Sequence, residues 1–589
     1  MFRRTWHLAP FIWALLVWAL LVWALSPLGS AESPGAFDVI VVGSEPEGIA
    51  AAVAAAETGA RTLLVSQDAR VGGLFVLGGL NSLDLRAHAL VQRGLFERWW
   101  NLVGRGAAFG TEAAERAFRV MLEDAGVTVQ LGTPQVIPVV WQGRVVGVQV
   151  GEETISAAQV IDATADGDVA AAAGAAYTLG FGSLGVGERM ADTRVFRLDG
   201  LDWAALVREI KEKGGSYAQV SGDAVWGSFG GFPAAYKAEQ TGLRLRGLNL
   251  GRQPDGSVLV NALLAYDVDP ASPKSVADGL MRARLEAPRI TRYLRALPGF
   301  ENATYSGVAG RLYIREWRHF KTRCTLSVGD TLDNIVRPDD IAAGNYPLDV
   351  QTLTPDDDGY VYGVPDVYGA RLCVALPERL DNRGLDNLWV VGKSAGYDPL
   401  AAASARVVPF GMALGEAVGV AAADAARTGR SAQAYAADKA AVAGLRGQLE
   451  ARGAYLPEVK PRTPTGPTSH PYFEAYRTLR RKGLALGGYT NDPGLDETMS
   501  TRGFLYLLSN VGKRFWADDT LGQTLLGEFS SLSGDLTRRS AFALAQAASC
   551  ALGACRSDWQ TLLVEGPKRA LTRGEAYALA AALATPEGE

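Results

Sequence analysis

The residues with the clearest chemical potential form a glycine turn between two apolar segments. The turn reads Gly-Ser-Glu-Pro-Glu-Gly over residues 43–48; it follows the β-branched run Val39–Val42 and precedes an alanine-rich segment ending near Glu57. In a strand–turn–helix unit, such a turn presents backbone N–H groups at the helix N-terminus, where the helix dipole favours a pyrophosphate. Gly43 permits the tight turn, and Gly48 permits close packing of helix on strand. The pattern predicts dinucleotide binding; the alternative is an ordinary α/β unit without this function.

Two positions depart from the usual dinucleotide fingerprint. Glu45 stands where a second glycine is common, so the backbone is less free to approach a phosphate there. Ser66 follows the second apolar run, Thr62–Val65, at the place where an acidic side chain usually binds a ribose. A serine hydroxyl can hydrogen-bond a ribose, but more weakly than a carboxylate. Asp68 lies only nearby.

Three later segments add polar and glycine-rich positions. Ile161–Asp168 places several side-chain oxygens at the expected carboxyl end of a strand, where open α/β sheets bind ligands. The alternative for this segment is a polar turn with Asp168 as the N-cap of the next helix. Gly384–Gly396 predicts a turn, a short strand and a glycine loop, and Ala402–Ala423 predicts a loop leading into a helix of small residues.

In this order, the segments resemble the FAD-dependent oxidoreductases of the glutathione-reductase-like, two-domain flavoprotein type. The resemblance covers residues 37–430 and rests on five motifs: Gly43–Ala52, Gly72-Gly73, Ile161–Asp168, Arg315–His319 and Asn387–Ala422. Ala165 stands where this family usually has glycine. The resemblance implies an α/β fold with an FAD/NAD(P)-binding Rossmann-like core and an inserted mixed β-sheet substrate domain. An all-α domain is expected after it.

The resemblance further implies an extended FAD, with its pyrophosphate at Gly43–Gly48 and its flavin end near Gly392–Arg406. Lys393 could reach a phosphate or only solvent. No second glycine turn for a nicotinamide is visible, which disfavours NAD(P)H as a partner. The expected cofactor-binding residues are Gly43, Ser44, Glu45, Pro46, Glu47, Gly48, Ser66, Gly72, Gly73, Asp162, Ala163, Thr164, Asp168, Gly392, Lys393, Arg406 and Val407.

Three residues are the catalytic candidates: Arg315, His319 and Arg406. Leu312–His319 is expected to be a strand, whose alternation would place Arg315 and His319 on one face. A cation beside the flavin could stabilise its anionic reduced form, and a histidine could exchange a substrate proton. The alternative is an ion-paired strand with a structural histidine. Arg406 could bind an anion or form a salt bridge at the entry of the following helix.

Composition excludes several classes of protein. A chain of 589 residues is too long for one core, and a formal charge of −5 argues against a nucleic-acid binder. Four histidines without metal-ligand spacing make a metal site unexpected. The sequence has no Cys-x-x-Cys; Cys550 and Cys555 could form a local disulfide or remain thiols, whereas Cys324 and Cys373 stand alone.

The N-terminus predicts export. Residues 1–31 contain Arg3-Arg4, the apolar run Phe11–Leu25 and the small-residue end Gly29-Ser30-Ala31, as in a secretory signal peptide. An uncleaved membrane anchor and a buried helix are the alternatives. The protein is therefore expected to be periplasmic, cell-surface or secreted.

The C-terminal region repeats a Thr-Arg helix start. The repeats begin at Thr501, Thr537 and Thr572, with spacings of 36 and 35 residues, which predicts stacked helical units. They are similar to surface-layer homology modules, which attach to cell-wall polymer; a plain packing or dimerisation domain is the alternative. The expected domains are a signal peptide (1–31), the two parts of the FAD-binding domain (37–176 and 376–430), a substrate domain (177–375), a linker (431–467) and a helical repeat domain (468–589).

The sequence thus predicts an exported FAD-dependent oxidoreductase. It would transfer a hydride between a small organic substrate and the flavin, with an electron acceptor that the sequence does not identify. One alternative, motivated by Glu45 and Ser66, is a cell-wall-associated binding or structural protein with a degenerate flavin fold. Another is an FAD-linked isomerase or hydratase.

Overall fold

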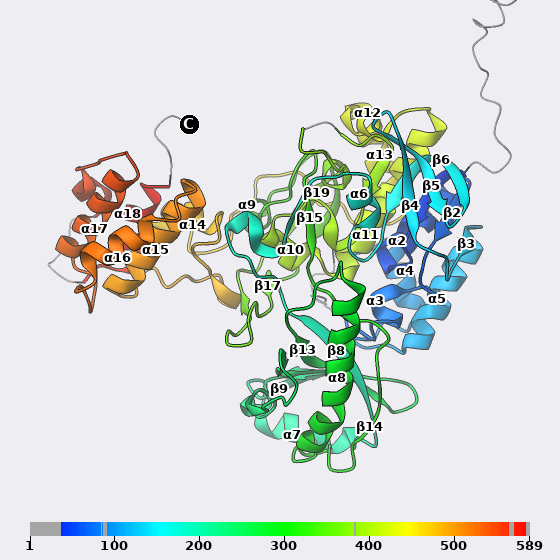
Figure 1. The fold of residues 1–589 in the computed structure, drawn as a ribbon, viewed down its shortest axis with the longest axis horizontal. Helices are drawn as coiled ribbons and strands as arrows, with labels where there is room; N and C mark the ends of the chain where they lie inside the picture. The colour runs from blue at the N-terminus through cyan, green and yellow to red at the C-terminus, as the bar shows by residue number, and fades with distance from the viewer. Residues whose placement is uncertain (1–36, 84, 86–90, 382–383, 565–569, 585–589) are drawn as a thin grey trace, which may run out of the picture. The chain divides into compact units, whose positions relative to one another are not determined.

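A seven-stranded, mostly parallel sheet forms the core of the protein (Figure 1). The structure is a computed structural model that describes residues 37–83, 85, 91–381, 384–564 and 570–584. The predicted signal peptide lies outside the described residues. The sheet order is β3-β2-β1-β6-β5-β4, with β20 beside β6. Its strands are β1 (Phe37–Val42), β2 (Thr62–Val65), β3 (Thr128–Gln130), β4 (Val136–Trp141), β5 (Arg144–Val150), β6 (Glu153–Asp162) and β20 (Leu388–Val390).

The central strands of this sheet are covered on both faces, which explains why their residues are almost entirely apolar. β1 pairs in parallel with β2 and β6, and β20 pairs in parallel with β6. Strands covered on both faces lose the alternation of polar and apolar residues. Val39 and Val41 face the cluster of helices α2 (Pro46–Glu57) and α11 (Val408–Arg427), whereas Ile40 and Val42 face the other side. The parallel arrangement brings the carboxyl ends of β1, β6 and β20 to one edge of the sheet.

The segments Val127–Gln130, Gln135–Val140 and Arg144–Val150 alternate in the sequence, which predicts a small inserted sheet; this prediction is only partly correct. β4 and β5 form an antiparallel hairpin that continues through β6, as the alternation predicts. β3, however, pairs in parallel with β2 and therefore extends the main sheet. A strand of three residues carries too little sequence pattern to specify its partner.

Helices α2 and α11 pack with their backbones in close approach. Gly411, Gly415 and Gly419 recur every fourth residue and therefore lie on one face of α11. A Cβ atom on Gly415 would lie 2.2 Å from the carbonyl oxygen of Glu47, and one on Gly419 would lie 2.2 Å from that of Ala51. Among the described helices, α11 alone is long and apolar enough to cross a membrane by length and composition, and it is 94% buried in this core.

This contact yields the first prediction. Gly415→Val should destabilise the protein by about 1–3 kcal/mol, because the new side chain must push α11 away from α2. Gly444→Ala, on the exposed face of α13 (Lys439–Ala451), meets no atom within 4 Å. This control should be neutral or stabilising by about 0.5–1 kcal/mol, since alanine favours helix over glycine. Denaturant unfolding measures both changes; equal stabilities would contradict the close-packing argument.

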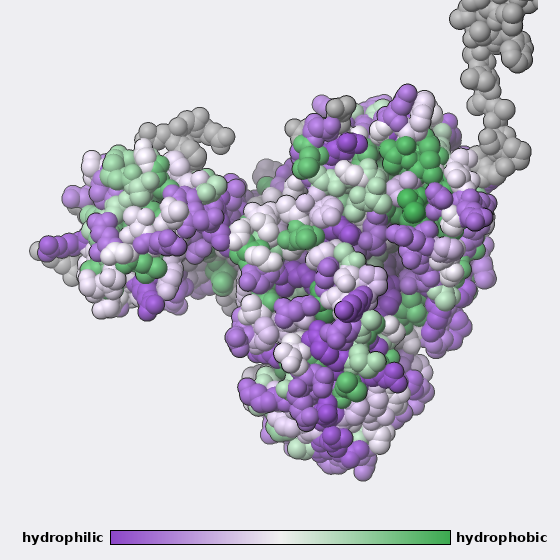
Figure 2. Space-filling view, viewed as in Figure 1, coloured by the Kyte–Doolittle hydropathy of each residue, from purple (hydrophilic) through white to green (hydrophobic). Residues whose placement is uncertain are grey.

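A second seven-stranded sheet forms the inserted domain, in the order β14-β8-β13-β12-β10-β9 with β11 beside β13. The sequence alternates over Leu243–Leu250 and Ser257–Leu264 with a turn at Gln253–Gly256, which predicts a β-hairpin. The prediction is confirmed, because β12 pairs antiparallel with β13. Helix α8 (Pro273–Leu294) continues through Pro288 and lies along this sheet (Figure 1). The exposed surface of the domain mixes hydrophilic side chains with apolar ones such as Met281 (Figure 2). The strands are β8 (Asp192–Asp199), β9 (Ala218–Ser221), β10 (Ala224–Gly227), β11 (Leu243–Leu245), β12 (Leu248–Arg252), β13 (Val258–Ala265) and β14 (Thr304–Val308), with α7 (Trp203–Lys213).

The C-terminal region is helical. Thr537 and Thr572 are N-caps, as predicted, and each also forms a capping box. The N-cap of α15 is Ser500 instead, and Thr501 is its first helical residue. Serine and threonine are both good caps, so the repeat pattern alone does not fix the boundary. The helices are α14 (Phe473–Arg480), α15 (Thr501–Phe515), α16 (Leu521–Phe529), α17 (Arg538–Ala551) and α18 (Arg573–Ala581).

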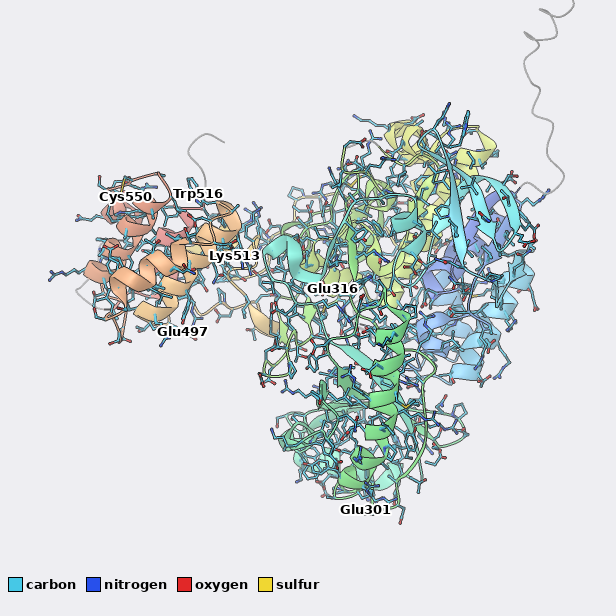
Figure 3. All side chains as sticks on the ribbon, viewed as in Figure 1. Glu301, Glu316, Glu497, Lys513, Trp516 and Cys550 are labelled. Carbon is cyan, nitrogen blue, oxygen red and sulfur yellow. A yellow bond between two sulfur atoms is a disulfide. The ribbon has the colours of Figure 1, made fainter. Side chains whose placement is uncertain are left out.

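All four cysteines form disulfides. Cys550 bonds Cys555 in the C-terminal helical region, which confirms one of the two alternatives (Figure 3). Cys324 bonds Cys373, which corrects the expectation that these two stand alone. They are 49 residues apart in sequence, and only the tertiary fold brings them together.

The remaining elements connect the two sheets and cover the core. These are α3 (Gly73–Val76), α4 (Leu95–Leu102), α5 (Thr111–Asp124), α6 (Asp168–Ala172), β7 (Tyr177–Leu179), β15 (Arg318–Phe320), α9 (Val328–Leu332), β16 (Asp340–Gly344), β17 (Asp349–Val350), β18 (Tyr360–Val361), β19 (Tyr368–Arg371), α10 (Pro399–Ala405) and α12 (Ala432–Ala437).

A single carboxylate joins α14 to the end of α9. Asp333 is 2% exposed and forms ion pairs with Arg477, Arg480 and Arg481. Arg480 is itself fully buried, so this contact places charges inside the protein. Burial opposes ionisation of Asp333, but the hydrogen bonds from the three guanidinium groups hold its pKa below the usual value.

Asp333→Asn should therefore destabilise the protein by about 3–5 kcal/mol, because it leaves the Arg480 charge buried without a carboxylate. Since the pKa of Asp333 is lowered on folding, its stabilisation is present above the ordinary aspartate pKa of 3.8 and is lost as the pH falls through the folded value. The difference between wild type and variant should shrink in acid. Asp496→Asn, at a side chain that is 93% exposed, should change stability by less than about 0.5 kcal/mol. Denaturant unfolding of both variants is the measurement.

Candidate functional site

The glycine turn lies at the carboxyl edge of the main sheet, against the end of β6. Gly43 has a φ of +109°, and a Cβ atom there would lie 2.2 Å from the carbonyl oxygen of Ala163. A Cβ atom on Gly48 would lie 2.6 Å from the carbonyl oxygen of Gly43. Glycine is thus required at both positions, because β1, α2 and β6 lie too close together there to leave room for a side chain. No side chain caps the N-terminus of α2, so its first N–H groups remain available to a phosphate.

Glu45 turns away from this N-terminus and supports the neighbouring loop. Its carboxylate accepts a hydrogen bond from the Leu74 N–H (2.8 Å) at the start of α3. A Cβ atom on Gly73 would lie 2.0 Å from this carboxylate, which explains glycine at that position. Arg311, from the inserted domain, pairs with Glu45 at 2.7 Å and with Asp68 at 2.8 Å. Glu45 therefore acts in positioning the Gly72–Gly73 loop, which explains why this fold accepts a glutamate in place of glycine.

Ser66 lies at the end of β2, where the sequence placed it. Its hydroxyl is 3.0 Å from that of Ser44, and it accepts a hydrogen bond from the Asp68 N–H (3.1 Å). Both serines are buried. The contact between the Ser44 and Ser66 hydroxyl groups stabilises the turn that follows β2.

Asp162 organises the loop between β6 and α6. It accepts hydrogen bonds from the N–H and hydroxyl of Thr164 and, at 2.7 Å, from the N–H of Ala170. Burial raises the pKa of Asp162 to about 6, against these hydrogen bonds. The alternative of Asp168 as N-cap is wrong, because Gly167 occupies that position. Asp168 instead pairs with Arg318 at 2.8 Å.

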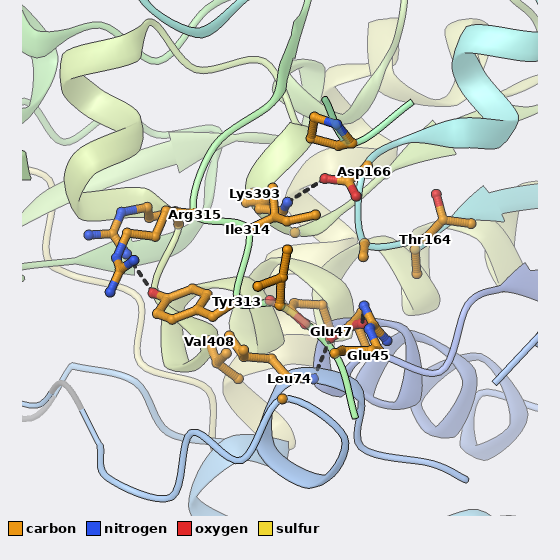
Figure 4. Close-up of a pocket in the computed structure, with 18 of the residues that line it drawn as sticks. Glu45, Glu47, Leu74, Thr164, Asp166, Tyr313, Ile314, Arg315, Lys393 and Val408 are labelled. Carbon is orange, nitrogen blue, oxygen red and sulfur yellow. Dashed lines mark hydrogen bonds and ion pairs between the residues drawn. The ribbon is translucent and has the colours of Figure 1, made fainter. Parts of the chain in front are cut away.

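A cavity of about 230 Å³ lies at this edge, between the core and the inserted domain (Figure 4). Lys393 and Asp166 face each other there at 2.6 Å. Figure 4 shows Glu45 and Thr164 on one side and Arg315 on the other. The residues that line it are Glu45, Glu47, Leu74, Gly78, Ala163, Thr164, Ala165, Asp166, Pro270, Val276, Leu280, Gly310, Arg311, Leu312, Tyr313, Ile314, Arg315, Val391, Gly392, Lys393, Arg406 and Val408.

Glu47 is a buried carboxyl group in this lining. Its pKa is raised to about 8, first by burial and then by the nearby charge of Glu45, while Lys393 acts in the opposite direction. Glu47 is therefore mostly protonated at neutral pH. A neutral carboxyl group adds no negative charge beside the N-terminus of α2.

Arg315 and Arg406 meet on Tyr313. Arg315 donates to the carbonyl of Ala191 (2.8 Å) and the hydroxyl of Thr193 (2.7 Å), and its guanidinium lies 4.3 Å from the centre of the Tyr313 ring. Arg406 donates to the Tyr313 hydroxyl at 2.7 Å. Burial, with the repulsion of neighbouring guanidinium groups, lowers the pKa of Arg315 to about 10.

His319 does not line the cavity that Arg315 and Arg406 line. Residues 312–317 do not form the expected strand, because β15 begins only at Arg318 and pairs with β7. The predicted alternation is therefore wrong: the His319 Nε2 atom lies 2.7 Å from a carboxylate oxygen of Glu316, three residues earlier. Among the described residues that line the cavity, Arg315 and Arg406 are present and His319 is not.

The predicted cofactor residues thus fall into two groups. Glu45, Glu47, Ala163, Thr164, Gly392, Lys393 and Arg406 line the cavity, whereas Gly43, Ser44, Pro46, Gly48, Ser66, Gly72, Gly73, Asp162, Asp168 and Val407 shape the turns behind it. Val407 is the N-cap residue of α11. Sequence reasoning missed Arg311 and Tyr313. Tyr313 stands two residues before the Arg315–His319 motif, whereas Arg311 has no local signal because its partners are more than 240 residues away in sequence.

The parallel sheet, the glycine turn at a helix N-terminus and the inserted sheet domain define a two-domain dinucleotide-binding protein. A family model for FAD dependent oxidoreductases matches residues 38–447, and the chain belongs to this family. The protein is an FAD-dependent oxidoreductase, and its α/β fold class is confirmed. The uncapped N-terminus of α2 and the protonated Glu47 beside it fit an anionic dinucleotide. Lys393 and Arg311 lie at the same edge of the sheet, each paired with carboxylates. No curated protein sequence matches the chain.

Solved structures with related folds are distant in sequence. A p-nitrophenol 4-monooxygenase from Pseudomonas putida is 12% identical, with 72% of this chain and 91% of that chain covered and a TM-score of 0.36. A geranylgeranyl bacteriochlorophyll reductase-like protein from Thermoplasma acidophilum is 11% identical, with 71% and 84% covered and a TM-score of 0.32. A flavin-dependent brominase is 12% identical, with 70% and 83% covered and a TM-score of 0.34.

Glu47 makes stability depend on pH. Because its pKa is raised on folding, its contribution is fully present below the ordinary glutamate pKa of 4.5 and is lost as the pH rises through about 8. Glu47→Gln should therefore gain in melting temperature over the wild type as the pH rises across this range. The exposed Glu123→Gln on α5 is the control and should follow the wild-type profile. Thermal unfolding at several pH values measures this, and parallel profiles for wild type and Glu47→Gln would refute the assignment.

Proposed function

We propose that this protein is an exported FAD-dependent oxidoreductase that transfers a hydride between a small organic substrate and the flavin, and passes the electrons to an external acceptor. The observation that carries the proposal is the cavity, which joins the N-terminus of α2 and the Lys393 loop to a buried arginine pair. It lies between the core and a separate sheet domain, as a substrate site requires. Export is proposed from residues 1–31 of the sequence.

The bound FAD supplies the redox chemistry, since its flavin accepts and returns electrons as a hydride. The protein supplies position and electrostatics. The N–H groups of α2 would hold the pyrophosphate, and Lys393 would contribute a cation at the same edge of the sheet. The segment 310–315 and α8 line the cavity from the side of the inserted domain. Arg315 and Arg406 would stabilise negative charge in the site.

Arg311 tests how the cofactor is held. It balances the carboxylates of Glu45 and Asp68, so Arg311→Gln leaves both uncompensated close to the proposed pyrophosphate position. We expect FAD affinity to fall by about tenfold or more, equivalent to ~1.4 kcal/mol. The measurement is the visible absorption of protein purified from Glu32 onward, with the released FAD titrated back. Arg284→Gln, at an exposed position of α8, is the control and should keep its FAD.

The same spectrum separates the alternatives. Stoichiometric FAD in the wild type, bleached by substrate without an acceptor, supports the oxidoreductase. A folded protein that is colourless and fails to take up added FAD would refute it and favour a binding or structural protein with a degenerate flavin fold. Turnover without net bleaching would favour an FAD-linked isomerase or hydratase. The proposed attachment of residues 468–589 to a cell-wall polymer stays a prediction.

A further inference from the structure

The arginine end of the cavity holds more positive than negative charge. Arg315 is 2% exposed, and in the described part of the chain it forms no ion pair with a carboxylate. Arg246 and Arg406 repel it, whereas Asp349 and the buried Asp192 attract it. Asp192 already pairs with Arg189, at 2.7 Å. Asp349 already contacts Arg406, at 3.4 Å. A buried guanidinium is costly unless an anion compensates it.

The hydrogen bonds of Arg315 fix the position of this charge. One nitrogen, Nη1, donates to both Ala191 and Thr193 on the inserted domain, and the guanidinium lies over the Tyr313 ring. These partners are neutral, so they orient the cation without neutralising it. The same tyrosine accepts a hydrogen bond from Arg406, which aligns two cations on the cavity wall. The planar fork of N–H donors of a guanidinium group matches the geometry of a carboxylate.

Apolar side chains form part of the cavity wall. Leu74, Val276, Leu280, Leu312, Ile314 and Val408 all line the cavity. Glu45 and Thr164, on the turn side, lie across the cavity from Arg315 (Figure 4). The arginine end therefore lies away from the proposed pyrophosphate position, and the cavity combines a cationic end with apolar wall surface.

We propose that this end of the cavity recognises the carboxylate of the substrate, and that the substrate is an organic acid with an apolar body. The inference rests on the proposed function, since it names the substrate class of that same site. The carboxylate would pair with Arg315 and Arg406, and the carbon skeleton would pack on the apolar wall towards the flavin.

The test compares an acid with its uncharged analogue. The probes are 3-phenylpropanoate and 3-phenylpropanamide, titrated into the FAD-loaded protein by calorimetry and by perturbation of the flavin spectrum. We expect the acid to bind at least about 30-fold more tightly than the amide, because loss of one partner of a buried charge pair is expensive. Equal affinities, or preference for the amide, would overturn the proposal without any variant.

Variants of Arg315 test whether this residue causes the preference for the acid over the amide. Arg315→Gln should bring the two affinities together, Arg315→Lys should keep part of the preference for the acid, and Arg284→Gln should leave it unchanged. The FAD content of each sample is measured alongside. If Arg315→Gln stays folded but loses its FAD, or keeps the full preference for the acid, the proposal is wrong, because the arginine then serves the cofactor or is not the carboxylate partner. If the wild-type protein takes up no FAD, the proposed function is refuted instead. Selective binding of the acid by this FAD-free protein would still support the anion site.

Discussion

The contact between α2 and α11 determines where every part of the cavity lies. Helix α2 begins at the glycine turn, and α11 begins at Val408, two residues after Arg406, so the approach of the two helices brings the turn and the arginine together. The approach depends on Gly415 and Gly419, whose backbones lie against the carbonyl groups of α2. Any larger side chain there would separate the helices and displace the two sides of the site. The many alanines of α2 have the same effect, because their short side chains let α2 pack closely against both the sheet and α11.

The charges of the site follow from this tight packing. Several ionisable groups of the cavity are buried, and burial shifts the pKa of such a group or requires a close partner for it. Glu47 responds by remaining protonated near neutral pH, and Glu45 and Asp68 share Arg311. Arg315 has only neutral partners and remains charged in a buried position. Such groups destabilise the protein and therefore mark the places where a ligand completes the electrostatics.

The C-terminal helices are joined to the rest of the chain by a different interaction. Asp333 receives three guanidinium groups from α14 and the residue after it, one of which is fully buried. An ion pair of this kind fixes orientation through its geometry, whereas apolar contacts alone would permit sliding. The arrangement gives these helices a defined attachment, in addition to their own apolar core.

The sequence by itself determined the features that depend on neighbouring residues. The β1–turn–α2 unit, the hairpin of β12 and β13, the caps at Thr537 and Thr572 and the FAD-dependent family all follow from local spacing, because turns, caps and periodicity act over a few residues. Contacts between distant segments were decided only by the tertiary structure. These include the pairing of β3 with β2, the Cys324–Cys373 disulfide, the role of Arg311 and the position of His319 outside the cavity that Arg315 lines. Residues 312–317 alternate in sequence as a strand does, yet they form irregular chain along the cavity. They contact both the core and the inserted domain, and the sequence does not show that these two domains are neighbours.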